Sequence, residues 1–316
     1  MLPVTPHFFP RTLPLTPMLR QLRLLFAFAF LASCQLFAAE TPPAFKLPSL
    51  YHAGFWVRDV AKSRAFYHDL LGYEEPYNLS RDGKLQMAVL KVNERQVIYL
   101  FPDASKILPN GDNLDHLGLE TDNLEAVRRH LLATGVKVGE IRHARVGDLT
   151  LGVHDPDGHY YEITQLEPQG QLRQHQGRSL APERVSDRLL SATIMVADLK
   201  AALHFYRDIL GFVQIDTDNR QLAASGVIRL RVPHGDDYLD LMPYFRNPGT
   251  PALRGVPDYC LEVPDVRKTF GTLTTRAKTL GVPGPTAIAE SVEGRLTTSL
   301  TDPDGTVVIF KELKRR

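Results

Sequence analysis

Two stretches of the chain carry the same pattern and decide the fold. Residues 50–72 read LYHAGFWVRDVAKSRAFYHDLLG, and residues 189–211 read LLSATIMVADLKAALHFYRDILG. In each stretch, a strand-like apolar run ends near an Asp, a segment containing Phe-Tyr follows, and a glycine comes last. The offset between the two stretches is constant: Asp59 and Asp198 are 139 residues apart, as are Gly72 and Gly211. The apolar spacing before each glycine predicts a helix, and glycine is where helices commonly stop. The chain therefore contains two related halves.

Each half divides again into two similar modules. Residues 155–158 and 302–305 both read Asp-Pro-Asp-Gly, and the run–Asp–helix pattern recurs at 114–134. Strand candidates follow the helices at 86–92, 96–101, 149–154, 160–165, 227–232, 237–243, 297–301 and 306–311. We therefore expect an α+β fold of four βαβββ modules, forming two domains of curled mixed sheets with helices outside. Paired modules would enclose a cleft suited to a small molecule.

The length of 316 residues fits two domains. We predict a first domain over 45–167, a polar linker over 168–188 and a second domain over 189–316. Lys and Arg total 37 and Asp and Glu total 36, so no concentrated basic face for nucleic acid is expected. The chain has only two cysteines, which excludes a disulfide framework and a zinc site of four thiolates.

The amino-terminal 44 residues are predicted to be an export signal and a short connection. Residues 24–39 read LLFAFAFLASCQLFAA and follow Arg20 and Arg23, the pattern of a secretory signal rather than of a full spanning helix. Residues 31–34 also resemble a bacterial lipobox, in which Cys34 would be lipidated; cleavage near residues 38–39 and a retained anchor are the alternatives. The expected location is the bacterial periplasm or the outer membrane, with membrane contact only through this segment.

The strand–Asp–helix–Phe-Tyr–Leu-Leu-Gly pattern and the closing Asp-Pro-Asp-Gly turns resemble the vicinal oxygen chelate superfamily over residues 50–313. That superfamily includes glyoxalase I, extradiol ring-cleaving dioxygenases and the fosfomycin- and bleomycin-resistance proteins. The resemblance implies a fold of four βαβββ modules acting on a small molecule. It does not choose the reaction, because one fold hosts many chemistries.

The resemblance also implies a ligand set for one divalent metal ion. The family's ligand positions on the first and last strands of modules hold His52, His116 and Glu162. The remaining position holds Tyr99, where glyoxalase I typically has Glu, and a phenol ligates poorly unless it is ionised. Two imidazoles and one carboxylate leave coordination positions open, which favours Fe(II), with Mn, Zn or Ni as alternatives.

Strand alternation predicts the surroundings of these ligands. It places Gly54 and Trp56 on the His52 face, Gly118 on the His116 face and Tyr160 on the Glu162 face. We expect Trp56 and Tyr160 to line the substrate pocket and the two glycines to leave room for a bound molecule.

Three residues are candidate catalytic groups. His143 lies before the strand predicted at 149–154, and His154 ends that strand beside the Asp-Pro-Asp-Gly turn; an imidazole at either place could move protons during the reaction. Tyr99 is the third, by its place at the remaining ligand position.

The second half is predicted to lack a metal site. Its matching positions fall on Ser191, Tyr259 and Ile309, which are poor ligands, so its expected role is a cap or one wall of the pocket. Cys260 lies in a strand-like stretch and is expected to be buried and inert.

These features favour an Fe(II)-dependent extradiol-type dioxygenase acting on an aromatic diol. Two departures from that family count against it: residues 149–154 hold no acid–base Tyr or His at the family's spacing, and the metal set lies in the first half. A glyoxalase I-like lyase or isomerase is the alternative. A small-molecule binding or resistance protein without turnover is the second alternative.

Overall fold

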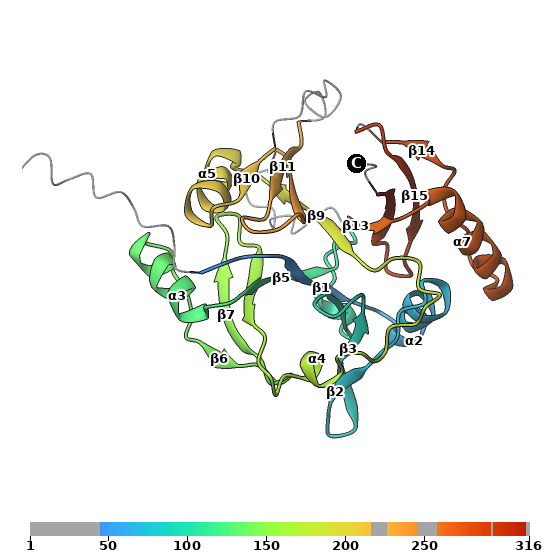
Figure 1. Ribbon diagram of the computed structural model, residues 1–316, viewed down its shortest axis with the longest axis horizontal. Helices are drawn as coiled ribbons and strands as arrows, with labels where there is room; N and C mark the ends of the chain where they lie inside the picture. The colour runs from blue at the N-terminus through green and yellow to red at the C-terminus, as the bar shows by residue number, and fades with distance from the viewer. Residues whose placement is uncertain (1–44, 216–225, 246–257, 292, 314–316) are drawn as a thin grey trace, which may run out of the picture. The chain divides into compact units, whose positions relative to one another are not determined.

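The fold consists of two eight-stranded mixed sheets with the same strand order (Figure 1). The computed structural model describes residues 45–215, 226–245, 258–291 and 293–313. In order across the first sheet, the strands are β2 (Tyr77–Arg81), β3 (Lys84–Lys91), β4 (Val97–Phe101), β1 (Leu50–Trp56), β5 (Leu114–Thr121), β8 (Tyr160–Gln165), β7 (Leu149–His154) and β6 (Arg142–His143). The second sheet runs β10 (Val213–Gln214), β11 (Ile228–Arg231), β12 (Tyr238–Pro243), β9 (Leu189–Val196), β13 (Asp258–Val263), β16 (Val307–Glu312), β15 (Leu296–Thr301) and β14 (Ala289–Glu290).

The strand pairing confirms the predicted four βαβββ modules and the α+β class. In the first sheet β1 pairs antiparallel with β5, while each of these two strands pairs in parallel with the last strand of a module, β4 or β8. The second sheet repeats this around β9 and β13. Because the first strands of two modules lie side by side, residues far apart in sequence meet on one inner sheet face.

Each module's helix begins and ends where the sequence indicates. α2 (Val60–Arg64) continues into the π-helical η2 (Ala65–Leu70), and α5 (Leu199–Leu203) continues into η4 (His204–Ile209). The Asp59 carboxylate caps α2 by accepting hydrogen bonds from two backbone N–H groups, which explains the Asp after each apolar run. Gly72 has φ of +83°, a left-handed conformation that favours glycine. The remaining helices are η3 (Ala104–Lys106), α3 (Leu124–Ala133), α4 (Gln171–Gln174) and α7 (Val266–Leu280).

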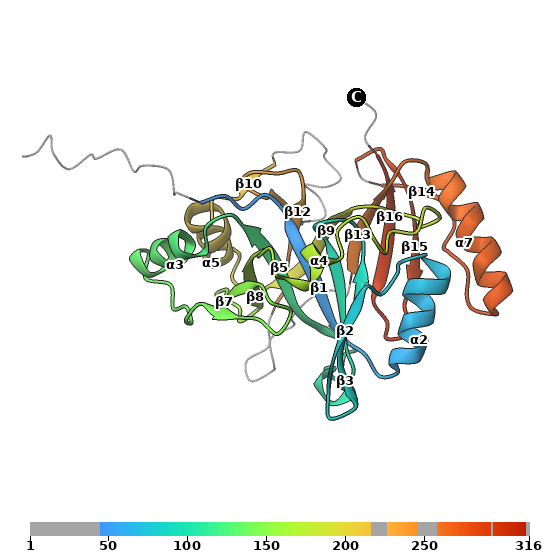
Figure 2. The ribbon, with the colours of Figure 1, turned by 60° about the horizontal axis from the view of Figure 1, so that its bottom comes forward.

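The two halves hold each other through their repeated motifs. The Tyr67 hydroxyl of the first half donates to Asp302 at 3.2 Å, and the Tyr206 hydroxyl of the second half donates to Asp155 at 2.6 Å. Figures 1 and 2 show the matching helix pairs, with α2 beside α7 and α3 beside α5. The Phe-Tyr motif of each half therefore binds the Asp-Pro-Asp-Gly turn of the other, and one hydrophobic core contains residues of both halves.

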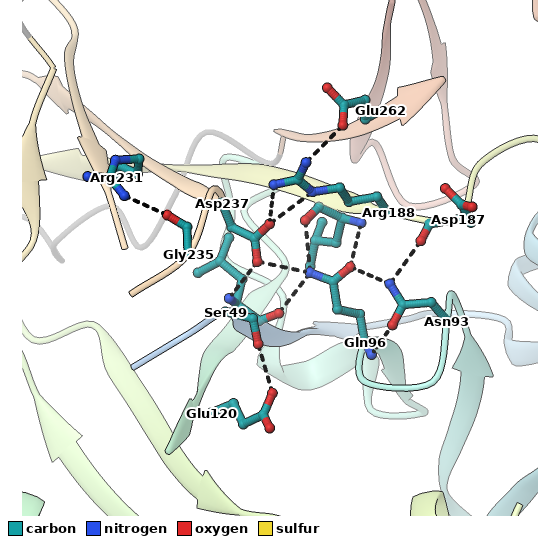
Figure 3. A network of polar contacts seen from close by, with 12 residues as sticks. Ser49, Asn93, Gln96, Glu120, Asp187, Arg188, Arg231, Gly235, Asp237 and Glu262 are labelled. Carbon is teal, nitrogen blue, oxygen red and sulfur yellow. Dashed lines mark hydrogen bonds and ion pairs between the residues drawn. The ribbon is translucent and has the colours of Figure 1, made fainter. Parts of the chain in front are cut away.

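A buried polar network joins the first strands of the two halves (Figure 3). The Gln96 side-chain amide donates to the carbonyl oxygens of Leu50 and Leu189 and accepts from the Leu189 N–H. Asp237, which precedes β12 as Gln96 precedes β4, accepts from the Leu50 N–H and pairs with Arg188 at 2.9 Å. The ends of β1 and β9 are thus satisfied by side chains of both halves.

The segment predicted as a linker, 168–188, contains α4 and packs against the first half. Leu172 is buried, and the fully buried Lys91 ammonium group donates to the carbonyl oxygens of His175 and Arg178. The polar composition of this segment therefore reflects hydrogen bonding to the first sheet rather than a free connection.

Residues 1–44, including Cys34 and the rest of the predicted export signal, lie outside the described residues. Within the described ranges, no helix has the length and apolar character needed to cross a membrane.

Candidate metal centre

Three strands bring the predicted ligands together on the inner face of the first sheet. His52 lies on β1, His116 on β5 and Glu162 on β8. His52 pairs with Gly118, which in turn pairs with Glu162, and His116 pairs with Gly54. One donor atom from each of the three residues lies within 4.8 Å of the others. The alternation and strand order therefore bring these side chains to one point.

The two glycines make room for the ligand side chains themselves. A Cβ atom on Gly118 would lie 2.3 Å from the His52 ring, and one on Gly54 would lie 3.1 Å from the His116 ring. Each imidazole thus covers the glycine of the neighbouring strand. The expectation that these glycines leave space for a bound molecule was wrong, because strand pairing places a ring over each of them.

The imidazoles are held with free nitrogens, as metal ligands need. His116 Nδ1 is 2.6 Å from the Asp115 carboxylate, which leaves its Nε2 directed toward Glu162, 3.9 Å away. His116 Nε2 and both ring nitrogens of His52 are buried, with no hydrogen-bond partner among the described residues. Burial, aided by His116, lowers the pKa of His52 well below its ordinary value and keeps it neutral. Unpartnered buried nitrogens are costly unless something binds them.

The donor set fits a divalent ion. Metal–nitrogen and metal–oxygen bonds of about 2.0–2.2 Å bring ligand atoms to about 3–4 Å from one another. Because the donor atoms lie within 4.8 Å of one another, the widest pair would have to draw together by at most about 1–2 Å to bind one ion. An Asp bound to the second nitrogen of a ligand His is the usual arrangement that fixes the ring.

Tyr99 is a packing residue beside this set. Its ring centroid lies 4.4 Å from that of His52, and its hydroxyl lies 3.1 Å from the Tyr51 hydroxyl. Burial, followed by the neighbouring Tyr51 and Tyr77, raises the pKa of Tyr99 well above its ordinary value. A neutral phenol is a weak ligand, so three protein donors remain.

A cavity of about 600 Å³ opens beside two of the three candidate ligands, while His52 lies beneath its lining. Its lining includes His116 and Glu162 and the predicted Trp56, Tyr99, Tyr160 and His143. The described residues that line it all belong to the first half, so the expectation that the second half supplies a wall is wrong for this part of the chain.

His154 is not among the described residues that line the cavity. Its side chain is exposed, and its ring lies 5.1 Å from that of Tyr160. The structure thus brings His143, but not His154, to the cavity.

Sequence reasoning missed Arg142 and Asp115. The Arg142 guanidinium lies 3.1 Å from the Glu162 carboxylate and 3.3 Å from the Tyr160 hydroxyl. Burial and the Glu162 charge raise the pKa of Tyr160. The sequence Asp115-His116 could have indicated the paired carboxylate, whereas Arg142 lies in a two-residue strand without a pattern.

The second sheet holds different residues at the matching positions. Ser191 pairs with Cys260 as His52 pairs with Gly118, so the position matching His116 is Asp258. The predicted match, Tyr259, was wrong by one residue. The helix caps explain the error. Taking Asp122 as the counterpart of Asp265 gives Tyr259, but α3 is capped by Asn123, and matching that residue to Asp265, the cap of α7, gives Asp258.

Ion pairs occupy the inner face of the second sheet. Asp240, which matches Tyr99, accepts hydrogen bonds from Nε and Nη2 of Arg229 at 2.7 and 2.6 Å, and Arg229 and Lys311 both pair with Glu293. Cys260 is buried, and burial raises its pKa to about 11. Among the described residues, His52, His116 and Glu162 are the one group of three side chains arranged to hold a metal.

Comparison with known proteins supports this architecture. Solved structures with a similar fold include the Mn(II)-bound glyoxalase from Novosphingobium aromaticivorans (TM-score 0.61, 18% identity, 85% of this chain and 83% of that one). They also include a catechol 2,3-dioxygenase (TM-score 0.61, 18% identity, 85% and 89%). The 2,3-dioxygenase LapB from Pseudomonas sp. KL28 has a TM-score of 0.63 with 14% identity, over 85% of this chain and 93% of that one.

Sequence comparison gives the same result. The uncharacterized protein YaeR of Escherichia coli K12 is 33% identical over 103 residues, which cover 30% of this chain and 78% of YaeR. The model of the Glyoxalase/Bleomycin resistance protein/Dioxygenase superfamily matches residues 49–163 and again residues 188–310. The chain, with its two matched segments and two sheets of the same strand order, belongs to the Glyoxalase/Bleomycin resistance protein/Dioxygenase superfamily.

Proposed function

We propose that the chain is a metal-dependent enzyme that binds one divalent ion through His52, His116 and Glu162 and acts on a small molecule in the adjoining cavity. We propose Fe(II) as the ion and ring cleavage of an aromatic diol, of the extradiol type, as the reaction. The observation that carries this proposal is the cluster of three donors, with buried unpartnered imidazole nitrogens, at a cavity of about 600 Å³. Two His and one carboxylate leave neighbouring coordination positions for substrate and dioxygen.

When bound, Fe(II) would chelate the diol and supply the redox chemistry that dioxygen needs. The chain's own residues would orient the substrate and move its protons. Met87, Phe101 and Trp56 present an apolar surface on which an aromatic ring can pack. Tyr160 and His143 line the same cavity. His143 is exposed, and among the described residues no side chain or backbone group pairs with its ring, so its imidazole is available to accept a diol proton and return it to the product.

A glyoxalase I-like lyase or isomerase is the second candidate. It is supported by the Mn(II)-bound glyoxalase that shares the fold. In such a reaction the ion would polarise a carbonyl, and a carboxylate or imidazole would transfer a proton between neighbouring carbons. The buried phenol of Tyr99 at the remaining ligand position makes this candidate the weaker one, because it leaves three protein ligands instead of four.

The deciding experiment uses full-length protein purified without oxygen and loaded with Fe(II). Mixed with catechol, it should consume oxygen and form a ring-opened product, and His116→Ala should do neither. His204→Ala, an exposed imidazole of the second half, is the matched control and should keep the activity. Conversion of methylglyoxal and glutathione by the Mn- or Ni-loaded protein, without oxygen uptake, would instead establish the second candidate. Binding of catechol with neither reaction would indicate a binding protein.

We also propose that residues 1–44 direct export, on the basis of the two arginines, the apolar run and the small residues after it. Mass spectrometry of the protein from a bacterial host tests this. A mature chain beginning at Cys34 with added lipid supports a lipoprotein, and one beginning near residue 40 supports ordinary cleavage. A full-length chain confined to the cytoplasm would contradict export.

A further inference from the structure

The cavity has two chemically different kinds of lining. Strands β2, β3 and β4 contribute mainly apolar side chains, among them Leu79, Met87 and Phe101. The short strand β6 and the turn after it contribute Arg142, His143 and Arg145. A ligand that fills the cavity therefore meets apolar groups along one set of strands and cationic groups along another segment.

The acidic groups of the lining already have partners. The Asp115 carboxylate is bound to His116 Nδ1 at 2.6 Å, and the Asp103 carboxylate accepts hydrogen bonds from Ser105. Glu162 contacts Arg142 through one oxygen and faces His116 through the other. Hydrogen bonds thus hold all three carboxylates in place; Asp103, whose partner Ser105 is neutral, keeps its full charge.

Arg145, in contrast, is exposed to the cavity without a counter-charge. Among the described residues, no hydrogen-bond acceptor or acid is paired with its guanidinium, and none is paired with the exposed His143 ring. A divalent ion at His52, His116 and Glu162 would add two positive charges to the same cavity. The positive charges of the two arginines and the ion would then exceed the negative charges of the three carboxylates by one. One monovalent anion would neutralise this excess.

We infer that the substrate carries a carboxylate, which Arg145 binds at the rim while the rest of the molecule reaches the metal centre; this inference rests on the proposed function. The planar fork of a guanidinium matches the two oxygens of a carboxylate. A carboxylate is preferred to a doubly charged phosphate because the excess of the lining is a single charge. Arg142 is already bound to Glu162 and Tyr160, so the free side chain of Arg145 is the recognition group.

The test compares two probes, 3,4-dihydroxybenzoate and its neutral methyl ester, which share the diol ring and differ in the charge and in one methyl group. Full-length protein loaded with Zn²⁺ binds them without redox turnover. The chain has a single Trp, Trp56, and it lines the cavity, so its fluorescence reports occupancy. The acid should bind about tenfold more tightly than the ester, the effect of about one charge-assisted pair. Arg145→Gln should remove this preference, and Arg267→Gln, an exposed arginine of α7, should retain it.

Two outcomes overturn the inference alone: equal binding of acid and ester by the unaltered protein, or an undiminished preference in Arg145→Gln. Failure of the zinc-loaded protein to bind either probe overturns the inference together with the proposed function. Because Arg145 is exposed and unpaired among the described residues, its substitution should leave the thermal midpoint unchanged, and this is checked on the same samples.

Discussion

The tightest contact at the candidate metal centre gives the sharpest prediction, for Gly118→Ala. A Cβ atom at this position would lie 2.3 Å from two atoms of the His52 ring, far inside van der Waals contact. The ring is fully buried, so it can yield only by leaving its place over β5. Overpacking of this kind costs about 1–3 kcal/mol of stability. Misplacing a ligand ring should also weaken metal binding by about 10–100-fold, as loss of a supporting contact does.

The assay is isothermal titration of the metal-free protein with Zn²⁺, paired with urea unfolding. Gly271→Ala is the matched control, because a Cβ atom there meets nothing within 4 Å and the residue lies inside α7. That change should leave zinc affinity unaltered and raise stability by about 0.5–1 kcal/mol, since alanine favours helices over glycine. If Gly118→Ala binds zinc as tightly as the unaltered protein, His52 does not hold the metal in the way described.

Three further predictions concern the surroundings of the site and the contact between the halves. Asp115→Asn should weaken zinc binding by about tenfold or more, because it removes the charge that fixes His116; unchanged affinity in the same titration would count against this role. Burial raises the pKa of Asp302 from 3.8 to about 6, so between pH 4 and 6 the folded chain binds the extra proton and stability falls as pH rises. The decrease from this residue is up to about 3 kcal/mol. Asp302→Asn should remove that part of the slope in urea unfolding across this range, and an identical slope in both proteins would refute it. Gln96→Ala leaves the Leu189 N–H and carbonyl without their partner and should cost about 1–3 kcal/mol, measured by urea unfolding at neutral pH; a loss below 0.5 kcal/mol would contradict the importance of this network.

The sequence contained the information needed for the modules and for the ligand set. Repeated apolar runs, capping Asp residues and closing glycines follow from local geometry. The helices at 60–70 and 124–133 therefore lie within a residue or two of 60–71 and 123–134, the ranges that the apolar spacing predicts. The three candidate ligands meet because alternation along a strand and the pairing of first strands are regular features of this architecture. These are properties of a chain segment and its immediate partner strand.

Features that depend on how the halves pack could not be predicted in the same way. The bonds from Tyr67 to Asp302 and from Tyr206 to Asp155 join motifs of different halves, and no local pattern specifies which turn each hydroxyl reaches. Arg142 reaches Glu162 from a two-residue strand that has no periodicity. The residue matching His116 was predicted one position too late, at Tyr259 instead of Asp258. Asp and Asn cap helices equally well, so the sequence alone did not show that Asn123, and not the preceding Asp122, caps α3.

Metal stoichiometry tests the central claim most directly. The full-length protein is reconstituted with Fe(II) or Zn²⁺, freed of excess ion and measured by elemental analysis beside His116→Ala and the control His204→Ala. The account predicts one ion per chain in the unaltered protein and in His204→Ala, and less than about one tenth of that in a folded His116→Ala, since two donors hold such an ion poorly. Full metal content in His116→Ala, or none in the unaltered protein, would contradict it.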